Sequence, residues 1–190
     1  MKKALFIGGT GTISTAISKR IAQSDEWELY VLNRGSRNNI LPSNVHSIVV
    51  NDVNDEAEVT KALNGLSFDC VCDFICFVPS QIERDYRIFK GITKQFMFIS
   101  SASAYQKPLG NYVINEGTPL ANPYWQYSRD KIACEDFLMK KYREEQFPIT
   151  IIRPSHTYDE RSIPLGVHGK NGSWQVVKRM LEGKPVIIHG

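Results

Sequence analysis

Two kinds of hydrophobic pattern alternate along the chain. Short, continuous apolar runs predict buried strands, and apolar residues spaced at the helical period predict amphipathic helices. Strands are expected at residues 4–7, 27–32, 45–50, 70–77, 95–99 and 148–152, and helices at residues 12–23, 55–66, 80–90, 124–145 and 173–182. Strands that are apolar throughout and alternate with helices indicate a parallel sheet covered on both faces. The pattern therefore predicts an α/β fold with a doubly wound parallel sheet.

The composition narrows the class of protein. The chain has 190 residues, of which 42% are hydrophobic and 23% charged, as in ordinary soluble domains. Its net charge of +3 is too small to require nucleic acid or a membrane as a partner. No apolar run approaches the roughly 20 residues of a membrane span, and the short apolar stretch after Met1 does not resemble a signal peptide. We expect a cytoplasmic protein.

Three of the four cysteines fall close together, as Cys70, Cys72 and Cys76, and the fourth is Cys134. Their spacing does not fit a zinc site, and the segment 69–77 has the pattern of a buried strand. Free cysteine packs as a small apolar residue. We therefore expect buried, reduced thiols and no metal.

The first strand ends in a glycine-rich turn, Gly8-Gly9-Thr10-Gly11, and a helical pattern begins directly after it. Glycine lets the backbone turn sharply and lets another group approach closely. The N-terminus of the following helix directs unpaired N–H groups and a positive dipole at the turn. Such a turn can hold a phosphate, although similar turns also serve packing alone.

Polar residues follow most of the predicted strands. In a doubly wound sheet, ligands bind beyond the carboxyl ends of the strands. The residues at those positions are Gly8, Gly11 and Ser14, then Asn33 and Arg34, Asp52 and Val53, Ser100 to Ser103, and Arg153 to His156. Their joint occurrence indicates a ligand site at this edge.

A tyrosine and a lysine, Tyr127 and Lys131, stand four residues apart at the start of the long helix. Residues at this spacing share a helical face, and Cys134 and Leu138 continue that face toward the interior. An ammonium beside a phenol favours the phenolate, which suits the tyrosine to acid–base catalysis near neutral pH. Ser101, at a strand end, would donate a hydrogen bond to the substrate oxygen.

These three motifs together resemble the short-chain dehydrogenase/reductase superfamily, and the Arg153-Pro154 pair resembles its extended branch, the NAD-dependent epimerase/dehydratase family. The resemblance implies a Rossmann-type dinucleotide-binding fold over residues 1–158. It implies that Gly8 and Gly11 hold the pyrophosphate, that Tyr127 is the acid–base and that Lys131 also binds the nicotinamide ribose. The remaining implied cofactor residues are Thr10, Thr12, Ile13, Asn33, Arg34, Asp52 and Val53 beside the adenine, Phe74 and Ile75, and Pro154.

The resemblance also bears on the substrate. It implies a nucleotide sugar and an epimerase, dehydratase or reductase reaction, with a homodimer as one assembly. Ser103, His156 and the loop from Ser162 to Gly172 are expected to border the substrate pocket. Residues 159–190 resemble the start of a C-terminal substrate subdomain, so we expect that subdomain to be incomplete and the chain to be a truncated fragment.

Two positions depart from the family pattern. Ser14 replaces the third glycine of the turn, which implies looser helix–strand packing or a hydroxyl near a phosphate. After the second strand, Asn33 and Arg34 stand where NAD-preferring members carry an acidic residue. An arginine suits a 2′-phosphate, so we predict that NADP is preferred, with NAD as the other cofactor that could bind.

Two functions without catalysis remain open. One is a cofactor-sensing regulator of the same fold, although a sensor does not need Ser101, Tyr127 and Lys131 together. The other is RNA binding, because Asn33-Arg34-Gly35 and Asp73-Phe74-Ile75 resemble a plastid RNA-binding branch of the superfamily. The low net charge, without a basic and aromatic stripe, gives RNA binding little support.

Overall fold

The computed structural model describes residues 1–159 and 174–187. The chain divides into two compact units, Met1–Pro154 and Ser155–Gly190. The described part of the second unit contains one helix, α5 (Trp174–Leu181). The loop from Ser162 to Gly172, expected near the substrate, lies outside the described residues.

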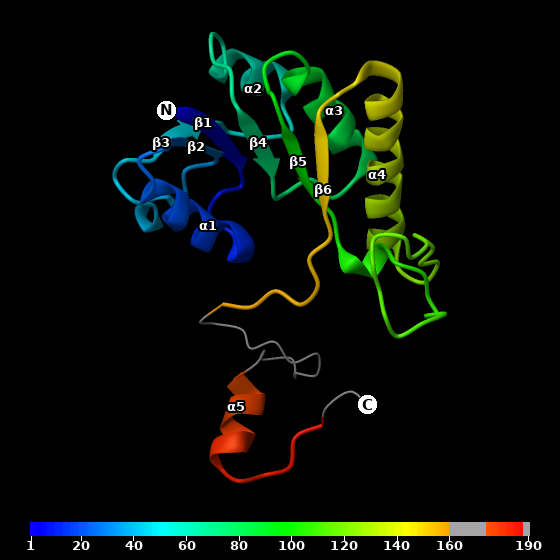
Figure 1. Ribbon diagram of the computed structural model, residues 1–190. Helices are drawn as coiled ribbons and strands as arrows, with labels where there is room; N and C mark the ends of the chain where they lie inside the picture. The colour runs from blue at the N-terminus through cyan, green and yellow to red at the C-terminus, as the bar shows by residue number, and fades with distance from the viewer. Residues whose placement is uncertain (160–173, 188–190) are drawn as a thin grey trace. The chain divides into compact units, whose positions relative to one another are not determined.

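The first unit is built on a six-stranded sheet (Figure 1). Its strands are β1 (Lys2–Ile7), β2 (Trp27–Asn33), β3 (His46–Val49), β4 (Cys70–Asp73), β5 (Phe96–Ile99) and β6 (Ile149–Ile152). Their order is β3-β2-β1-β4-β5-β6, and every pair is parallel. In such an order the chain connections reverse direction across the sheet between β1 and β4, which is the topological switch point. The predicted doubly wound fold is confirmed.

Helices connect the strands. They are α1 (Thr12–Ala22), α2 (Glu56–Ala62), α3 (Pro79–Phe89) and α4 (Gln126–Glu145), with short 3₁₀ turns η1 (Asn38–Ile40) and η2 (Ala102–Ala104). Local sequence sets several of their ends. Asp55 caps α2 by accepting the Glu58 N–H at 3.0 Å. Proline at the first position of α3 has no N–H to leave unpaired.

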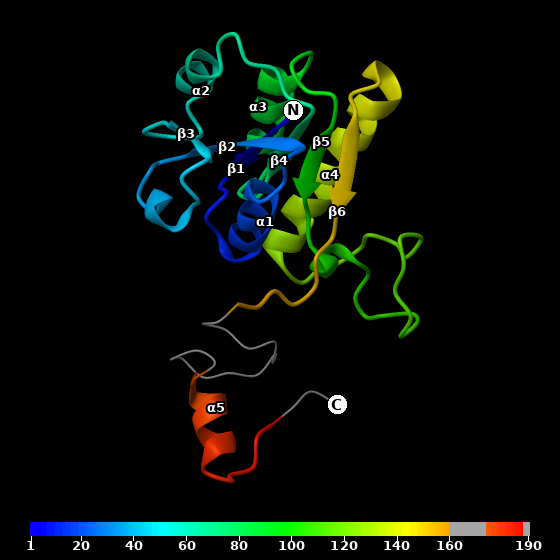
Figure 2. The ribbon, with the colours of Figure 1, turned by 60° about the vertical axis from the view of Figure 1, so that its left-hand side comes forward.

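The two faces of the sheet carry different cores. On one face, α2, α3 and α4 cover the larger cluster, in which Phe89, Phe96 and Leu138 are fully buried. On the other face, α1 covers a smaller cluster around Phe6 and Val31 (Figure 2). Continuous apolar strands are therefore explained by burial on both sides, as expected for parallel sheets.

All four cysteines are buried free thiols, as predicted. Burial raises the pKa of Cys70 to about 11, which keeps this thiol protonated at neutral pH. In the described part of the chain, no helix has both the length and the apolar character to cross a bilayer.

Candidate cofactor and active site

The glycine-rich turn lies in direct contact with two strands. Gly8 has a φ of +79°, and a Cβ built there would lie 2.6 Å from Cγ2 of Ile75, in the segment after β4. A Cβ on Gly9 would lie 2.8 Å from Cγ2 of Val31 on β2. Only glycine satisfies both the backbone angle and the approach at position 8. The turn is thereby held against β2 and the end of β4.

Ser14 belongs to this turn rather than loosening it. Its side chain is fully buried, and its hydroxyl donates to the Gly8 carbonyl at 2.7 Å. The same Oγ accepts the Gly11 N–H at 2.8 Å. The expectation that this serine loosens the packing of the helix on the strand is therefore corrected. The hydroxyl ties the turn to the first turn of α1 and gives the Gly11 N–H its acceptor.

A cavity of 220 Å³ opens beside the turn. Its lining comes from the ends of β1, β2, β3 and β4: Gly8, Thr10, Gly11, Asn33, Arg34, Ser36, Arg37, Val53 and Ile75. Most of these positions are predicted from the sequence, whereas Ser36 and Arg37 are missed. The polar run Arg34-Gly35-Ser36-Arg37 carries that signal, because it places a second arginine within the same turn.

The turn after β2 is braced from within. Asn33 Oδ1 accepts the Gly35 N–H at 2.6 Å, and its Nδ2 donates to Asn38 Oδ1 at 2.7 Å. Gly35 has a φ of +79°. Arg34 remains exposed at the rim of the cavity. Of the described residues that line this cavity, none carries a carboxylate, so its charged groups are both arginines.

Other predicted cofactor residues lie outside this lining. Asp52 is exposed, and its Oδ1 accepts the Asn54 N–H at 2.9 Å. Phe74 packs edge-on against Phe6 in the smaller core, with ring centroids 5.1 Å apart. The Pro154 carbonyl accepts the Ala102 N–H at 2.9 Å, beside η2. Thr12 and Ile13 form the first residues of α1, and His156 is exposed in the second unit.

Lys131 is the buried cation of the predicted active site. Its side chain is 2% exposed, and Nζ donates to the Cys76 carbonyl at 2.5 Å and to the Ile99 carbonyl at 2.7 Å. These carbonyls belong to the segment after β4 and to the last residue of β5. Burial lowers the pKa of Lys131. The lysine therefore joins α4 to the carboxyl edge of the sheet.

Tyr127 lies one turn before Lys131 on α4. The lysine Nζ is 5.6 Å from the centroid of the Tyr127 ring and 5.0 Å from that of Phe77. Trp125 lies 4.8 Å from Tyr127 between ring centroids. The tyrosine is half-buried, while Phe77 and Trp125 are exposed. The predicted pair thus meets in space, at the edge of an exposed aromatic group.

Ser101 follows β5 and caps η2. Its Oγ accepts the Ser103 N–H at 3.1 Å and donates to Ser103 Oγ at 2.9 Å. Ser128 Oγ donates to Ser103 Oγ at 3.0 Å, and Asn122 Nδ2 donates to the Ser103 carbonyl at 2.7 Å. Sequence patterns indicate Ser101 and Ser103 but miss Asn122, and they miss Ser128 although it lies between Tyr127 and Lys131. This hydroxyl network fixes η2 against α4.

A buried ion pair holds α4 against β6. Arg153 donates to both oxygens of Glu135, with Nη2 2.6 Å from Oε2. Glu135 is 1% exposed and also accepts from the Ser100 hydroxyl. Arg153 Nη1 donates to the Tyr105 hydroxyl at 3.1 Å. Arg153 follows a strand end, as predicted, and its contacts fix the helix that carries Tyr127 and Lys131.

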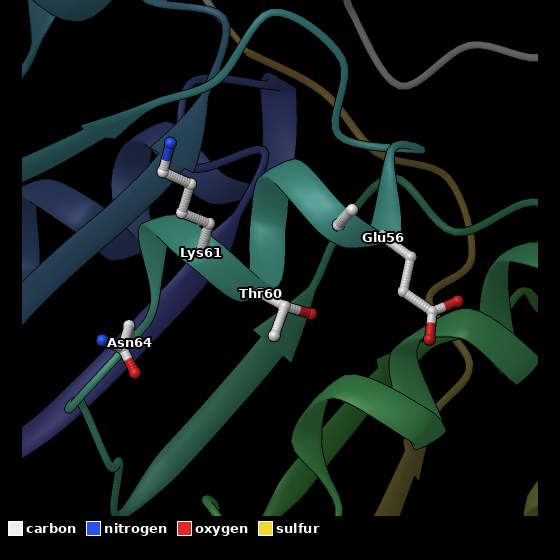
Figure 3. A pocket seen from close by; sticks show the side chains of 5 residues that line it. Glu56, Thr60, Lys61 and Asn64 are labelled. Carbon is white, nitrogen blue, oxygen red and sulfur yellow. The ribbon is translucent and has the colours of Figure 1, made fainter.

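A second hollow, of 680 Å³, lies along α2 (Figure 3). Its lining is Glu56, Ala57, Thr60, Lys61 and Asn64. The side chains of Glu56 and Lys61 point away from one another, and Glu56 Oε2 is already paired with Arg87 Nη2 at 2.7 Å. The polar groups do not converge, so we place the site at the carboxyl edge of the sheet instead.

Solved structures with the same fold include several epimerases. UDP-glucuronic acid 4-epimerase from Bacillus cereus, in complex with NAD, is 17% identical with a TM-score of 0.70 over 96% of this chain and 64% of that chain. UDP-glucose 4-epimerase from Thermus thermophilus, also with NAD, is 21% identical with a TM-score of 0.70 over 97% and 64%. Pal from Bacillus thuringiensis is 22% identical with a TM-score of 0.71 over 99% and 66%.

The chain therefore spans about two thirds of the length of these structures. No curated protein sequence matches the chain significantly. A family model described as the NAD dependent epimerase/dehydratase family matches residues 4–190, nearly the whole chain. Together with the parallel sheet and the glycine-rich turn at its switch point, this match shows that the chain belongs to the NAD-dependent epimerase/dehydratase family.

Proposed function

We propose that this chain carries the cofactor site and the catalytic Ser101–Tyr127–Lys131 group of an epimerase, dehydratase or reductase that acts on a nucleotide sugar. The observation that carries the proposal is the burial of Lys131 beside Tyr127, with two backbone carbonyls as acceptors. Burying an ammonium costs free energy, so a buried lysine in a ligand edge indicates a functional role. The nucleotide-sugar substrate is supported by the names of the similar solved structures.

The residues present fit a dinucleotide. The backbone at Gly8 lies so close to Ile75 that an added Cβ would be 2.6 Å from its side chain. The cavity beside Gly8 is lined in part by Arg34 and Arg37. Gly8, Thr10 and Gly11 would hold the pyrophosphate at the N-terminus of α1. Val53 and Ile75 would flank the adenine side of the cavity. When bound, the nicotinamide supplies hydride chemistry.

The chain's own groups supply proton transfer. Two of the three N–H donors of Lys131 are engaged by carbonyls, which leaves one for a ribose hydroxyl. The Tyr127 hydroxyl would remove or return a proton at a substrate hydroxyl. Ser101, whose hydroxyl donates to Ser103 Oγ in this structure, would turn to donate to the same substrate oxygen. The half-buried tyrosine beside exposed Phe77 and Trp125 is open to a substrate.

The substitution Tyr127→Phe tests this assignment. It removes the hydroxyl and keeps the ring between Phe77 and Trp125, so we expect cofactor affinity to stay and turnover to fall by about 10²–10⁴-fold. Isothermal titration with NAD and NADP measures the first quantity. Turnover of UDP-sugars measures the second. Unchanged turnover would contradict the role of Tyr127. Cofactor binding without turnover in the unsubstituted chain would favour the cofactor-sensing regulator, and binding of RNA without either cofactor would favour the RNA-binding alternative.

We propose further that the cofactor is NADP in preference to NAD. Arg34 and Arg37 line the cavity, and the described lining carries no carboxylate to accept a ribose 2′-hydroxyl. In Arg34→Ala, loss of charged hydrogen bonds of about 1.5–3 kcal/mol should weaken NADP by about 10- to 150-fold. NAD should bind nearly as before. Tighter binding of NAD than of NADP by the unsubstituted chain would contradict the preference.

We propose further that the protein forms a homodimer and is located in the cytoplasm.

A further inference from the structure

Two aspartates lie fully buried below the cofactor cavity. Asp73 ends β4 and is 0% exposed, and Asp85 lies on α3 and is 1% exposed. Among the described residues, their Oδ2 atoms are the buried side-chain atoms without a hydrogen-bond partner. A carboxylate oxygen of each lies within 4.8 Å of the other and of the Cys76 Sγ. Two buried oxygens without a partner, on carboxyl groups this close together, require an explanation.

The other oxygens of the pair are satisfied. Asp73 Oδ1 accepts the Ile75 N–H at 2.7 Å. Asp85 Oδ1 accepts from Arg84 Nε at 2.9 Å and from Nη2 at 2.5 Å. Arg84 Nη2 is also 3.9 Å from Asp73 Oδ2. One guanidinium therefore faces two carboxyl groups, and both oxygens that it leaves without a hydrogen bond are buried.

The charges on the neighbouring elements do not remove the repulsion between the carboxylates of Asp73 and Asp85. On α4, Lys131 lies within electrostatic range of Asp73, Cys134 and Glu135, and it already donates to two carbonyls. Glu135 is held by Arg153. On the segment after β4, a hydrogen bond with Cys134 and burial raise the pKa of Cys76, so its thiol is neutral. Before α2, Asn54 Oδ1 accepts from Arg84 Nη1 at 2.9 Å.

We propose that Asp73 and Asp85 share one proton between their Oδ2 atoms, and that this acid pair positions the segment Phe74–Val78 between the cofactor cavity and Lys131. Two carboxylate charges this close in the interior would repel one another strongly, and a proton held between the two groups removes that repulsion. Burial, followed by the charge of Asp73, raises the pKa of Asp85 well above its usual range. With one shared proton, the two aspartates and Arg84 have no net charge.

A proton fits this interior point better than a metal ion. The Arg84 guanidinium already contacts Asp85 and lies 3.9 Å from Asp73, so a divalent cation would meet a positive charge at close range. The neutral Cys76 thiol points its hydrogen toward the Val78 carbonyl, with Sγ 3.9 Å from that oxygen. A thiol must lose its proton to bind a metal.

The pair acts on the site through the backbone. Asp73 Oδ1 binds the Ile75 N–H, and Ile75 contacts Gly8 and lines the cavity. The next residue, Cys76, offers its carbonyl to Lys131. Asp73 and Asp85 are therefore positioning residues. The positioning role of the two aspartates rests on the proposed function, whereas the shared proton does not.

The substitution Asp85→Asn tests the proposal, because asparagine has the shape and charge of the protonated acid and can donate to Asp73. We expect the infrared spectrum of the unsubstituted chain at pH 7 to show a protonated carboxyl band that shifts in D₂O and is absent from Asp85→Asn. Cofactor affinity should stay within about twofold, since an isosteric donor replaces the acid, and Asp85→Ala should weaken it.

The pH profile gives a second readout. The folded chain holds a proton that the unfolded chain releases above about pH 4. The folded-to-unfolded ratio of the unsubstituted chain should therefore fall about tenfold per pH unit above that value, relative to Asp85→Asn. Asp69→Asn is the matched control, because a hydrogen bond from Lys94 lowers the pKa of Asp69. The protonated carboxyl band should remain in the spectrum of Asp69→Asn.

Each contrary result overturns the shared proton. These results are a missing protonated band in the unsubstituted chain, a band that survives Asp85→Asn, parallel pH profiles, or a stoichiometric divalent metal in the purified chain. If Asp85→Asn does not fold, the spectrum of the unsubstituted chain decides. The infrared result does not depend on the cofactor. It therefore tests the shared proton even if the proposed function fails.

Discussion

At the scale of single residues, Gly8 sets the distance between the first turn and the segment after β4. Its φ of +79° and the 2.6 Å that would separate an added Cβ from Ile75 are two separate obstacles to any side chain. Gly91 offers the comparison that separates them. It has a φ of +87°, and a Cβ there would meet nothing within 4 Å.

We therefore expect Gly8→Ala to cost more than Gly91→Ala. Gly91→Ala should lower the free energy of unfolding by about 1–3 kcal/mol through backbone strain alone. Gly8→Ala should lose about 1–3 kcal/mol more through overpacking against Ile75, and it should also lose cofactor affinity. Urea unfolding and cofactor titration of both variants measure these effects. Equal losses in both variants would show that the approach to Ile75 carries no strain.

Residue chemistry is where sequence reasoning reaches least far. The hydroxyl of Ser14 is turned back onto Gly8 and Gly11, which spacing alone does not reveal. Asp85 is a similar case, because a charged residue in a helix predicts an exposed position until its tertiary partner is known. By contrast, the pairing of Tyr127 with Lys131 follows from helical geometry and could be predicted.

At the scale of elements, the ends of α3 and α4 are joined by one carboxylate. Glu145, in the last turn of α4, accepts from Lys141 Nζ at 2.6 Å, and also from Lys90 and the Tyr86 hydroxyl. Hydrogen bonds from Lys141, Lys90 and Tyr86 lower the pKa of Glu145 to about 2. A carboxyl with a lowered pKa stabilises the folded chain when it is ionised.

The sign of the pH effect follows. The stabilisation is fully present above the unfolded pKa of about 4.3 and is lost as pH falls toward 2. We expect Glu145→Gln to be less stable than the unsubstituted chain at neutral pH and to lose less stability between pH 5 and pH 2, a window chosen around that pKa. Thermal unfolding across this range, at low salt, measures it. A constant difference between the two chains would contradict the assignment.

The end of β4 shows why a hydrophobic pattern can predict a strand longer than the one that forms. The apolar run at residues 70–77 predicts one strand, but β4 ends at Asp73. In the sheet, Asp73 pairs with Ile7, the last residue of β1, and the glycine turn begins directly after it. A strand beyond Asp73 would have no neighbour on that side. Hydrophobicity marks burial of the following residues, whereas the length of the neighbouring strand decides their conformation.

At the scale of the whole molecule, the parallel sheet and its strand sequence along the chain could both be predicted. They depend on periodicity and on short connections, which are local properties. The contacts that couple the parts could not. Ser36 and Arg37 at the cavity, and Asn122 and Ser128 behind η2, are brought into place by loops whose paths the pattern leaves undetermined.

The anchoring of Lys131 has a consequence for how the chain folds. Its two carbonyl acceptors lie 55 and 32 residues earlier in the sequence, at Cys76 and Ile99. The ammonium can leave water without a large cost only after both acceptors are in place. During synthesis, the strands that end at Ile7 and Asn33 can assemble well before α4 emerges. We expect the burial of Lys131 to come late and to couple the two halves of the sheet into one cooperative unit, so that Tyr127 is set in position only when the first half of the sheet has already folded.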